Sequence, residues 1–241
     1  MPRIYVGTAG WTIPREHAGG FPVAGSHLQR YAGVLTAVEI NSTFYRRHQP
    51  LTFLRWASAV HPDFRFAVKM PRAITHEAKL AAPRRLLAEF FDDIRFLDGR
   101  CGPILVQLPP SLAFDRRIGP AFFRCLRTLY AGPVAFEPRH ASWYGPPVDS
   151  LLLAHRIARV VADPPRPPEA RTSGGDPSLL YLRLHGSPRM YFSPYGPARV
   201  ATLAVSLSQA DHHADVWCIF DNTGFGAAAG DALDLQRLMK A

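Results

Sequence analysis

A chain of 241 residues can bury a large hydrophobic core without help from disulfides or metals. Apolar residues make up 47% of it and charged residues 20%, a composition that excludes a disordered or low-complexity chain. The formal net charge is +9, but the arginines that dominate the 28 basic residues are scattered, which favours solvated surface over a continuous nucleic-acid-binding face.

Short apolar runs recur along the chain and predict parallel strands that are covered on both faces. In chain order they occupy residues 4–8, 38–41, 66–69, 104–107, 135–137, 160–163, 181–185 and 218–221. Apolar residues at i, i+3 and i+4 predict helices over residues 26–36, 50–60, 83–97, 115–130, 147–157, 199–213 and 226–240. This alternation predicts an α/β fold, a single (β/α)8 TIM-type barrel over residues 1–241.

One crossover departs from the alternation. Residues 164–178 are rich in proline and glycine, and a regular helix is disfavoured there because proline lacks an N–H donor and glycine costs entropy. We therefore expect a Pro/Gly-rich loop in place of the sixth helix. A doubly wound open sheet remains the alternative architecture, because strand order is not visible in a sequence.

Most predicted strands end in an ionisable or amide side chain, and α/β enzymes keep their chemistry at the carboxyl ends of parallel strands. Side chains two residues apart on a strand share a face, which pairs several of these groups. The pairs are Glu39 with Asn41, Glu137 with Arg139, and Arg183 with His185; Asp221 can join them. We expect one pocket to collect Glu39, Lys69, Gln107, Glu137, Arg139, Asp163, Arg183, His185 and Asn222.

Such a cluster can hold an anion on its arginines while carboxylates and histidine move protons. The candidate catalytic residues are Glu39, Lys69, Glu137, Asp163 and His185. The candidate substrate-binding residues are Asn41, Gln107, Arg139, His140, Trp143, Arg183, Asn222, Gly224, Gly226, Trp11 and Tyr45. One divalent metal is an open alternative, with Glu137, Asp163 and His185 as candidate ligands, although no His-x-His or H-E-x-x-H spacing supports zinc.

Several of these features allow two interpretations. Lys69 can form a Schiff base if it is desolvated beside another cation, or it can pair with Glu39 of the preceding strand. The glycines at 224 and 226 can hold an anion at a helix start or permit close packing. The aromatic residues can stack on a substrate or pack the wall, and residues 186–197 are long enough to form a lid. His212 and His213 are expected on solvated surface.

The favoured functional hypothesis is an enzyme that acts on a small anionic substrate, phosphorylated or sugar-like, by acid/base chemistry. A metal-dependent phosphodiesterase or nucleic-acid-repair nuclease is the first alternative, and it requires clustered metals. A non-catalytic nucleic-acid or regulatory binder is the second, and it requires a basic face outside the pocket. We expect no membrane partner, and three cysteines outside any C-x-x-C spacing, with no export signal, indicate the cytoplasm.

Strings along nearly the whole chain resemble the YecE-like family, domain of unknown function 72. They include Gly7-Thr8-Ala9-Gly10-Trp11, Val38-Glu39-Ile40-Asn41-Ser42-Thr43-Phe44-Tyr45, Phe66-Ala67-Val68-Lys69, Gln107-Leu108-Pro109-Pro110, Phe136-Glu137-Pro138-Arg139-His140, Tyr181-Leu182-Arg183-Leu184-His185-Gly186 and Phe220-Asp221-Asn222-Thr223. The resemblance implies a TIM-type barrel and supplies no activity. The chain departs from the family at Pro138, usually Phe, and at Ala9, often Ser, while the ionisable residues all match.

Overall fold

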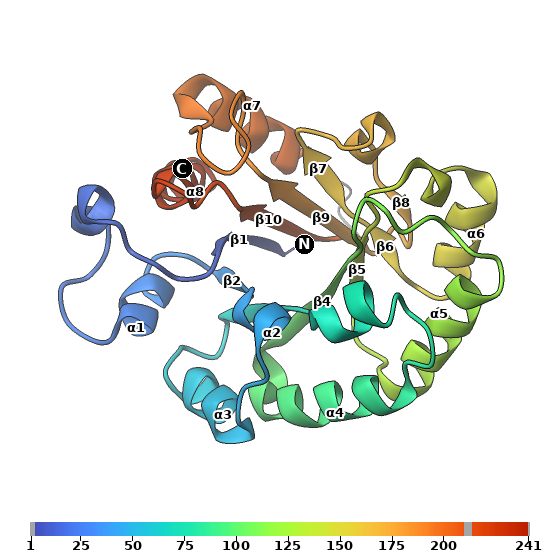
Figure 1. Ribbon diagram of the computed structural model, residues 1–241. Coiled ribbons are helices and arrows are strands. Elements are labelled where there is room, and N and C mark those ends of the chain that lie inside the picture. The colour runs from blue at the N-terminus through green and yellow to red at the C-terminus, as the bar shows by residue number, and fades with distance from the viewer. Residues whose placement is uncertain (1–2, 210–213, 241) are drawn as a thin grey trace.

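A curled sheet surrounded by helices forms the described part of the protein (Figure 1). The computed structural model describes residues 3–209 and 214–240, so His212 and His213 lie outside the described residues. The strands are β1 (Ile4–Ala9), β2 (Ala37–Ile40), β3 (Arg65–Lys69), β4 (Cys101–Gln107), β5 (Val134–Glu137), β6 (Ala158–Arg159), β7 (Val161–Asp163), β8 (Gly174–Gly175), β9 (Leu179–Leu184) and β10 (Asp215–Phe220).

The α-helices follow the strands as the apolar spacing predicts, with the short α2 in addition. They are α1 (His27–Ala32), α2 (Ser42–Tyr45), α3 (Pro50–Ser58), α4 (Arg84–Ile94), α5 (Ile118–Leu129), α6 (Pro146–Ala154), α7 (Gly196–Ser208) and α8 (Ala227–Leu238). Shorter turns of 3-10 helix span Arg15–Gly20, Arg95–Arg100, Ala141–Trp143 and Pro168–Arg171, and one π-helical turn spans Ala73–Glu77. No helix of the described residues is both long and apolar enough to cross a membrane.

Local sequence explains several helix starts. Ser26 begins α1 with a capping box, because its Oγ accepts from the Gln29 N–H at 3.3 Å while Gln29 Oε1 accepts from the Ser26 N–H at 2.8 Å. Proline stands in the first turn of α3 and α6, where a missing N–H donor costs no helical hydrogen bond. These residues explain where α1, α3 and α6 begin.

The strand order is β7-β9-β10-β1-β2-β3-β4-β5-β6-β8, and neighbouring strands are parallel except for β6 and β8. Strands β1 to β6 lie in their sequence order, unlike the reversing order of a doubly wound sheet. Only Val160 separates β6, which pairs with β5, from β7, which pairs with β9. Residues 164–178 contain a 3-10 turn and β8, with no α-helix.

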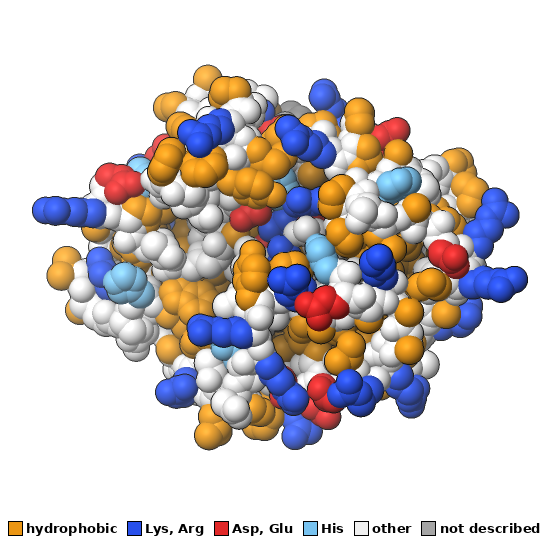
Figure 2. Space-filling view, in the orientation of Figure 1, with side chains coloured by type: hydrophobic (Ala, Val, Ile, Leu, Met, Phe, Trp, Pro, Cys, Tyr) orange, Lys and Arg blue, Asp and Glu red, His pale blue; other side chains and the backbone are white. Residues whose placement is uncertain are grey.

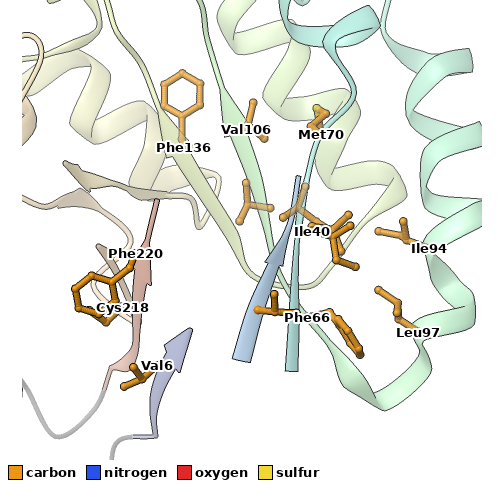
Figure 3. Close-up of a cluster of buried hydrophobic side chains, with 14 of the residues drawn as sticks. Val6, Ile40, Phe66, Met70, Ile94, Leu97, Val106, Phe136, Cys218 and Phe220 are labelled. Carbon is orange, nitrogen blue, oxygen red and sulfur yellow. The ribbon is translucent and has the colours of Figure 1, made fainter. Parts of the chain in front are cut away.

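The two faces of the sheet carry different side chains. One face packs against the helices, and Figure 3 shows Ile40 and Phe66 from strands near Ile94 and Leu97 from the helical layer. The opposite face holds a second buried cluster, Tyr5, Ala37, Ala67, Leu105, Ala135, Ala158, Val160, Leu179, Tyr181, Trp217 and Ile219. We call this second face the inner face, and the candidate site continues it toward the carboxyl ends of the strands.

Candidate functional site

Arg183 of β9 lies at the centre of the polar residues on the inner face, and none of it is exposed. Its Nε and Nη2 donate to Glu39 of β2 at 3.1 and 2.8 Å, and its Nη1 donates to Glu137 of β5 at 2.8 Å. Nη2 also donates to Asp221, directly after β10, at 2.9 Å. Burial opposes the guanidinium charge, but these carboxylates outweigh burial and raise the pKa of Arg183 well above its usual value.

This arrangement revises the expected role of Arg183. An arginine that is fully buried and directed at three carboxylates has no exposed donor for a substrate anion. It is better explained as the cation that allows Glu39, Glu137 and Asp221 to remain charged inside the protein, because buried charges require partners. Tyr181 adds a third donor to Glu39, through its hydroxyl at 2.8 Å.

Glu137, Arg139 and His185 form the part of the site that reaches an open pocket. Glu137 Oε1 accepts from Arg139 Nη2 at 3.0 Å and lies 3.4 Å from His185 Nε2. Burial opposes ionisation of Glu137, but Arg183 and Arg139 outweigh it and hold its pKa well below its usual range. Burial also opposes the charged form of His185, whereas hydrogen bonds to Asp221 and Glu137 dominate and raise its pKa.

The pocket beside these residues has a volume of about 340 Å³, within the size range of small-molecule sites. Its walls are Pro110, Glu137, Arg139, Ala162, Pro164, Arg166, His185, Met190 and Tyr191. Tyr191 comes from the loop after β9, and its hydroxyl accepts from Arg139 Nη1 at 3.3 Å. Figure 2 shows basic, acidic and histidine side chains gathered near the centre of this face of the molecule.

Lys69 and Gln107 end β3 and β4 on the inner face, and each is 8% exposed. Within the described residues, neither side chain makes a hydrogen bond or an ion pair; Lys69 Nζ lies 4.4 Å from the centroid of the Phe44 ring. Glu39 directs its carboxylate at Arg183 and Tyr181, so the expected pairing of Lys69 with Glu39 is not found. Burial, and then the charge of Arg183, lower the pKa of Lys69 to about 8.

Asp163 does not join the cluster, which corrects the expectation from its place at a strand end. Its Oδ2 accepts from Arg199 Nη2 of α7 at 2.8 Å, away from Glu137 and His185. The reason is strand alternation: Ala162 lines the pocket, so the next side chain points to the helical layer.

Trp143 and His140 also have structural rather than pocket contacts. Trp143 is 1% exposed, donates from Nε1 to the Leu112 carbonyl at 2.8 Å and packs against surrounding aromatic rings. His140 caps the 3-10 turn that follows β5, because its Nδ1 accepts from the Ser142 N–H at 3.2 Å. The structure therefore assigns Trp143 to the core and His140 to a turn, in place of the expected substrate contacts.

The turn after β10 contacts the loop over the pocket. Asn222 Nδ2 donates to the Ser193 carbonyl at 3.0 Å and to Asp231 of α8 at 2.7 Å. The Gly224 N–H donates to the Tyr191 carbonyl at 2.8 Å. A Cβ atom at Gly224 would lie 2.7 Å from the Phe192 ring. These contacts favour packing over the anion-binding interpretation of Asn222 and Gly224.

The remaining expected substrate contacts lie at the margins of the site. Gly226 has φ +85°, and a Cβ atom there would lie 2.7 Å from Pro14, so this glycine also serves close packing. Trp11 packs edge-on against Trp56 at a centroid distance of 5.0 Å. Tyr45 is 72% exposed. Asn41 follows β2 directly, and its Oδ1 is buried without a hydrogen-bond partner among the described residues.

The donors present do not fit the divalent metal considered from sequence. Across residues 3–209 and 214–240, no three His, Cys, Asp or Glu side chains are grouped so that they could hold a metal ion. Asp163 is turned away from the other two candidate ligands, Glu137 and His185. Arg183 supplies the positive charge among the carboxylates that a metal ion would otherwise supply.

Three contributors to the site were not among the catalytic and substrate-binding residues assigned from the sequence. Tyr181 carries a usable signal, because it stands two residues before Arg183 and therefore shares its face. Asp221 was expected nearby, and its contacts with both Arg183 and His185 at 2.9 and 3.1 Å make it a central carboxylate. Tyr191 was expected only as one of the aromatic residues of the loop at 186–197, and its contact with Arg139 depends on the path of that irregular loop.

Comparisons with known proteins show which family this chain is similar to. A family model described as "Protein of unknown function DUF72" matches residues 5–241. The UPF0759 protein YecE of Escherichia coli K12 is 34% identical over 126 residues, which cover 52% of this chain and 44% of that relative. The chain thus spans less than half the length of this curated relative, and the match to YecE of Escherichia coli O157:H7 has the same extent.

Solved structures show the same fold. A DUF72 family protein from Enterococcus faecalis V583 superposes with a TM-score of 0.82 at 22% sequence identity, covering 99% of this chain and 96% of that one. A DUF72 family protein from Thermotoga maritima MSB8 superposes with a TM-score of 0.79 at 25% identity, covering 99% of this chain and 100% of that one. The curled sheet and its helical layer are therefore shared with these structures.

Proposed function

The chain belongs to the DUF72 family, as its resemblance to YecE-like proteins predicts, and on that premise we propose that it is an enzyme acting on a small anionic substrate by acid/base chemistry. The family description names no reaction, so the proposal rests on the site. Its main support is the meeting of Glu137, Arg139 and His185 at one wall of a pocket of about 340 Å³.

In this proposal Arg139 and Arg166 hold the anionic group of the substrate. Both line the pocket, and the Arg139 side chain remains 21% exposed despite its ion pair with Glu137. His185 transfers the proton, because its raised pKa keeps the imidazole charged closer to neutral pH and its ring edge reaches the pocket. Glu137 stays ionised and stabilises the charged form of His185.

We also infer that the curled sheet is a (β/α)8 barrel and that the chain forms one domain. The support is that residues 158–163 pair with β5 through their first half and with β9 through their second half, which connects the two ends of the parallel series. A cytoplasmic location is part of the same proposal. It is supported by three cysteines, Cys101, Cys125 and Cys218, that form no disulfide.

The test of anion binding is calorimetric titration of the folded protein with inorganic phosphate. Arg139→Gln should weaken phosphate binding by about 10- to 100-fold, because a charge-assisted hydrogen bond contributes about 1.5–3 kcal/mol. Arg116→Gln is the matched control, since Arg116 is an exposed arginine outside the pocket and its loss changes the net charge equally. Equal phosphate affinity in wild type and Arg139→Gln would overturn the proposal.

A further inference from the structure

The amine of Lys69 is buried, and the carboxylates near it bind Arg183 instead. Lys69 is 8% exposed and ends β3 on the inner face. In the described part of the chain, Nζ makes no hydrogen bond or ion pair. It is not sealed from solvent. The amine therefore has free donors and is still reached by solvent.

Charged and titratable groups from several strands surround this amine. The charged and titratable groups that act on it are Arg183 of β9, Glu39 of β2, Glu137 of β5, Asp221 after β10 and His76 of the π-helical turn. The carboxylates direct their oxygens at Arg183 rather than at Lys69. Phe44 covers one side of the amine at 4.4 Å. A lysine desolvated beside another cation is the arrangement that activates an amine as a nucleophile.

We propose that Lys69 is a nucleophile that forms an imine with the substrate, and that the substrate therefore carries an aldehyde or ketone beside its anionic group. This inference rests on the proposed function, because it adds a carbonyl group to the substrate proposed there and takes the nucleophile from the inner face next to that pocket. The neutral Nζ attacks the carbonyl carbon and gives a carbinolamine, which loses its oxygen as one molecule of water and leaves a C=N bond. No external oxidant or reductant is needed.

The protonation state of the amine supports this chemistry. Burial and Arg183 lower the pKa of Lys69 to about 8, so about half of its amine is neutral at pH 8. Ordinary exposed lysines have a pKa near 10.4, so less than about 1% of their amine is neutral at that pH. Lys79 and Lys240, the other two lysines of the chain, are exposed and provide an internal comparison.

Two further polar atoms beside the cluster are buried with a distant partner or none. Within the described residues, Asn41 Oδ1 has no hydrogen bond, and His185 Nε2 has only Glu137 Oε1, at 3.4 Å. Buried polar atoms without partners are costly unless a ligand or water satisfies them. A substrate hydroxyl group could donate to Asn41, and His185 could exchange a proton with the carbonyl oxygen as it leaves.

The test is reductive trapping on the full chain with dihydroxyacetone phosphate and sodium cyanoborohydride, which delivers hydride to the imine carbon and leaves a stable secondary amine. Peptide mass mapping at pH 8 should find Lys69 modified at least tenfold faster than Lys79 and Lys240. Its rate should stop rising with pH near pH 8, where the Lys69 amine becomes mostly neutral. Equal or slower modification of Lys69 at pH 8 would overturn the inference, and this comparison needs no variant.

Uncharged dihydroxyacetone separates this inference from the proposed function. If both hold, Arg139→Gln should slow trapping of the phosphorylated ketone at Lys69 by a larger factor than it slows trapping of dihydroxyacetone. Selective trapping at Lys69 without any dependence on Arg139 would keep the imine and reject anion binding by Arg139. Phosphate binding that depends on Arg139, without selective trapping at Lys69, would keep the proposed function and reject the imine.

Discussion

Replacing Arg183 by Met would remove the cation that Glu39, Glu137 and Asp221 share while keeping a long side chain in its place. Removing one partner of a buried ion pair costs about 3–5 kcal/mol, because the remaining charge is left in the interior. We expect at least this loss in the free energy of unfolding at neutral pH. For a protein of this size that corresponds to a melting temperature lower by about 6–20 °C.

The loss should depend on pH. In the wild type, Arg183 outweighs burial and holds the pKa values of Glu137 and Asp221 below their usual range. These groups therefore contribute stability that is present above the unfolded pKa values of about 4 and is lost as the pH falls through the folded values. Without Arg183, burial should raise both pKa values, so the variant loses stability as the pH rises above about 4. The difference between the two proteins should be larger at pH 8 than at pH 5.

Urea unfolding followed by circular dichroism at pH 5 and pH 8 measures this difference. The matched control is Arg127→Met, because within the described part of the chain Arg127 donates only to neutral backbone carbonyls, including those of His155 and Gly132. Its cost should be the same at both pH values. A cost for Arg183→Met below about 1 kcal/mol, or one that does not grow with pH, would refute the assignment of Arg183 as the cation of the cluster.

Two further predictions test the assigned faces and contacts. Asp163→Asn should lower the free energy of unfolding by no more than about 1 kcal/mol, because its ion pair with Arg199 is partly exposed. It should leave phosphate affinity unchanged; weaker phosphate binding in calorimetry would show that Asp163 contributes to the pocket. Gly224→Ala should speed proteolytic cleavage of the loop at 186–195, because its Cβ would lie 2.7 Å from the Phe192 ring, whereas Gly99→Ala, with open space around it, should not. Equal cleavage of both variants would contradict the packing described for this turn.

The sequence predicts the elements of this fold well because they depend on local periodicity. Each predicted strand and helix overlaps an observed element, and the inner face can be followed by counting in twos from Ala67 to Lys69 or from Tyr181 to Arg183. The predicted place of Asp163 in the pocket is wrong because the prediction relied on the end of the apolar run rather than on this alternation. Ala158 lies on the inner face and Ala162 lines the pocket, so even-numbered residues of this segment point inward and Asp163 points outward.

The pairing of side chains within the cluster could not be derived from the sequence. Lys69 and Arg183 are both cations at inner-face positions, and no pattern tells which one binds Glu39. Arg183 binds it because a planar guanidinium can donate to several carboxylates at once, which leaves the amine of Lys69 without a partner among residues 3–209 and 214–240. The contact of Tyr191 with Arg139 could not be predicted either, because it depends on the path of a loop without sequence periodicity.

The attachment of the loop over the pocket to α8 has a consequence for biosynthesis. Asp231 of α8 accepts from the backbone N–H of Tyr195 at 3.0 Å, and Asn222 fixes the Ser193 carbonyl. Ribosomes release a chain from its amino end at about 5–20 residues per second, so α8 emerges after all the strands and after this loop. A nascent chain could then assemble its carboxylate cluster while the loop still lacks its anchor, which makes a covered pocket the last feature to be completed.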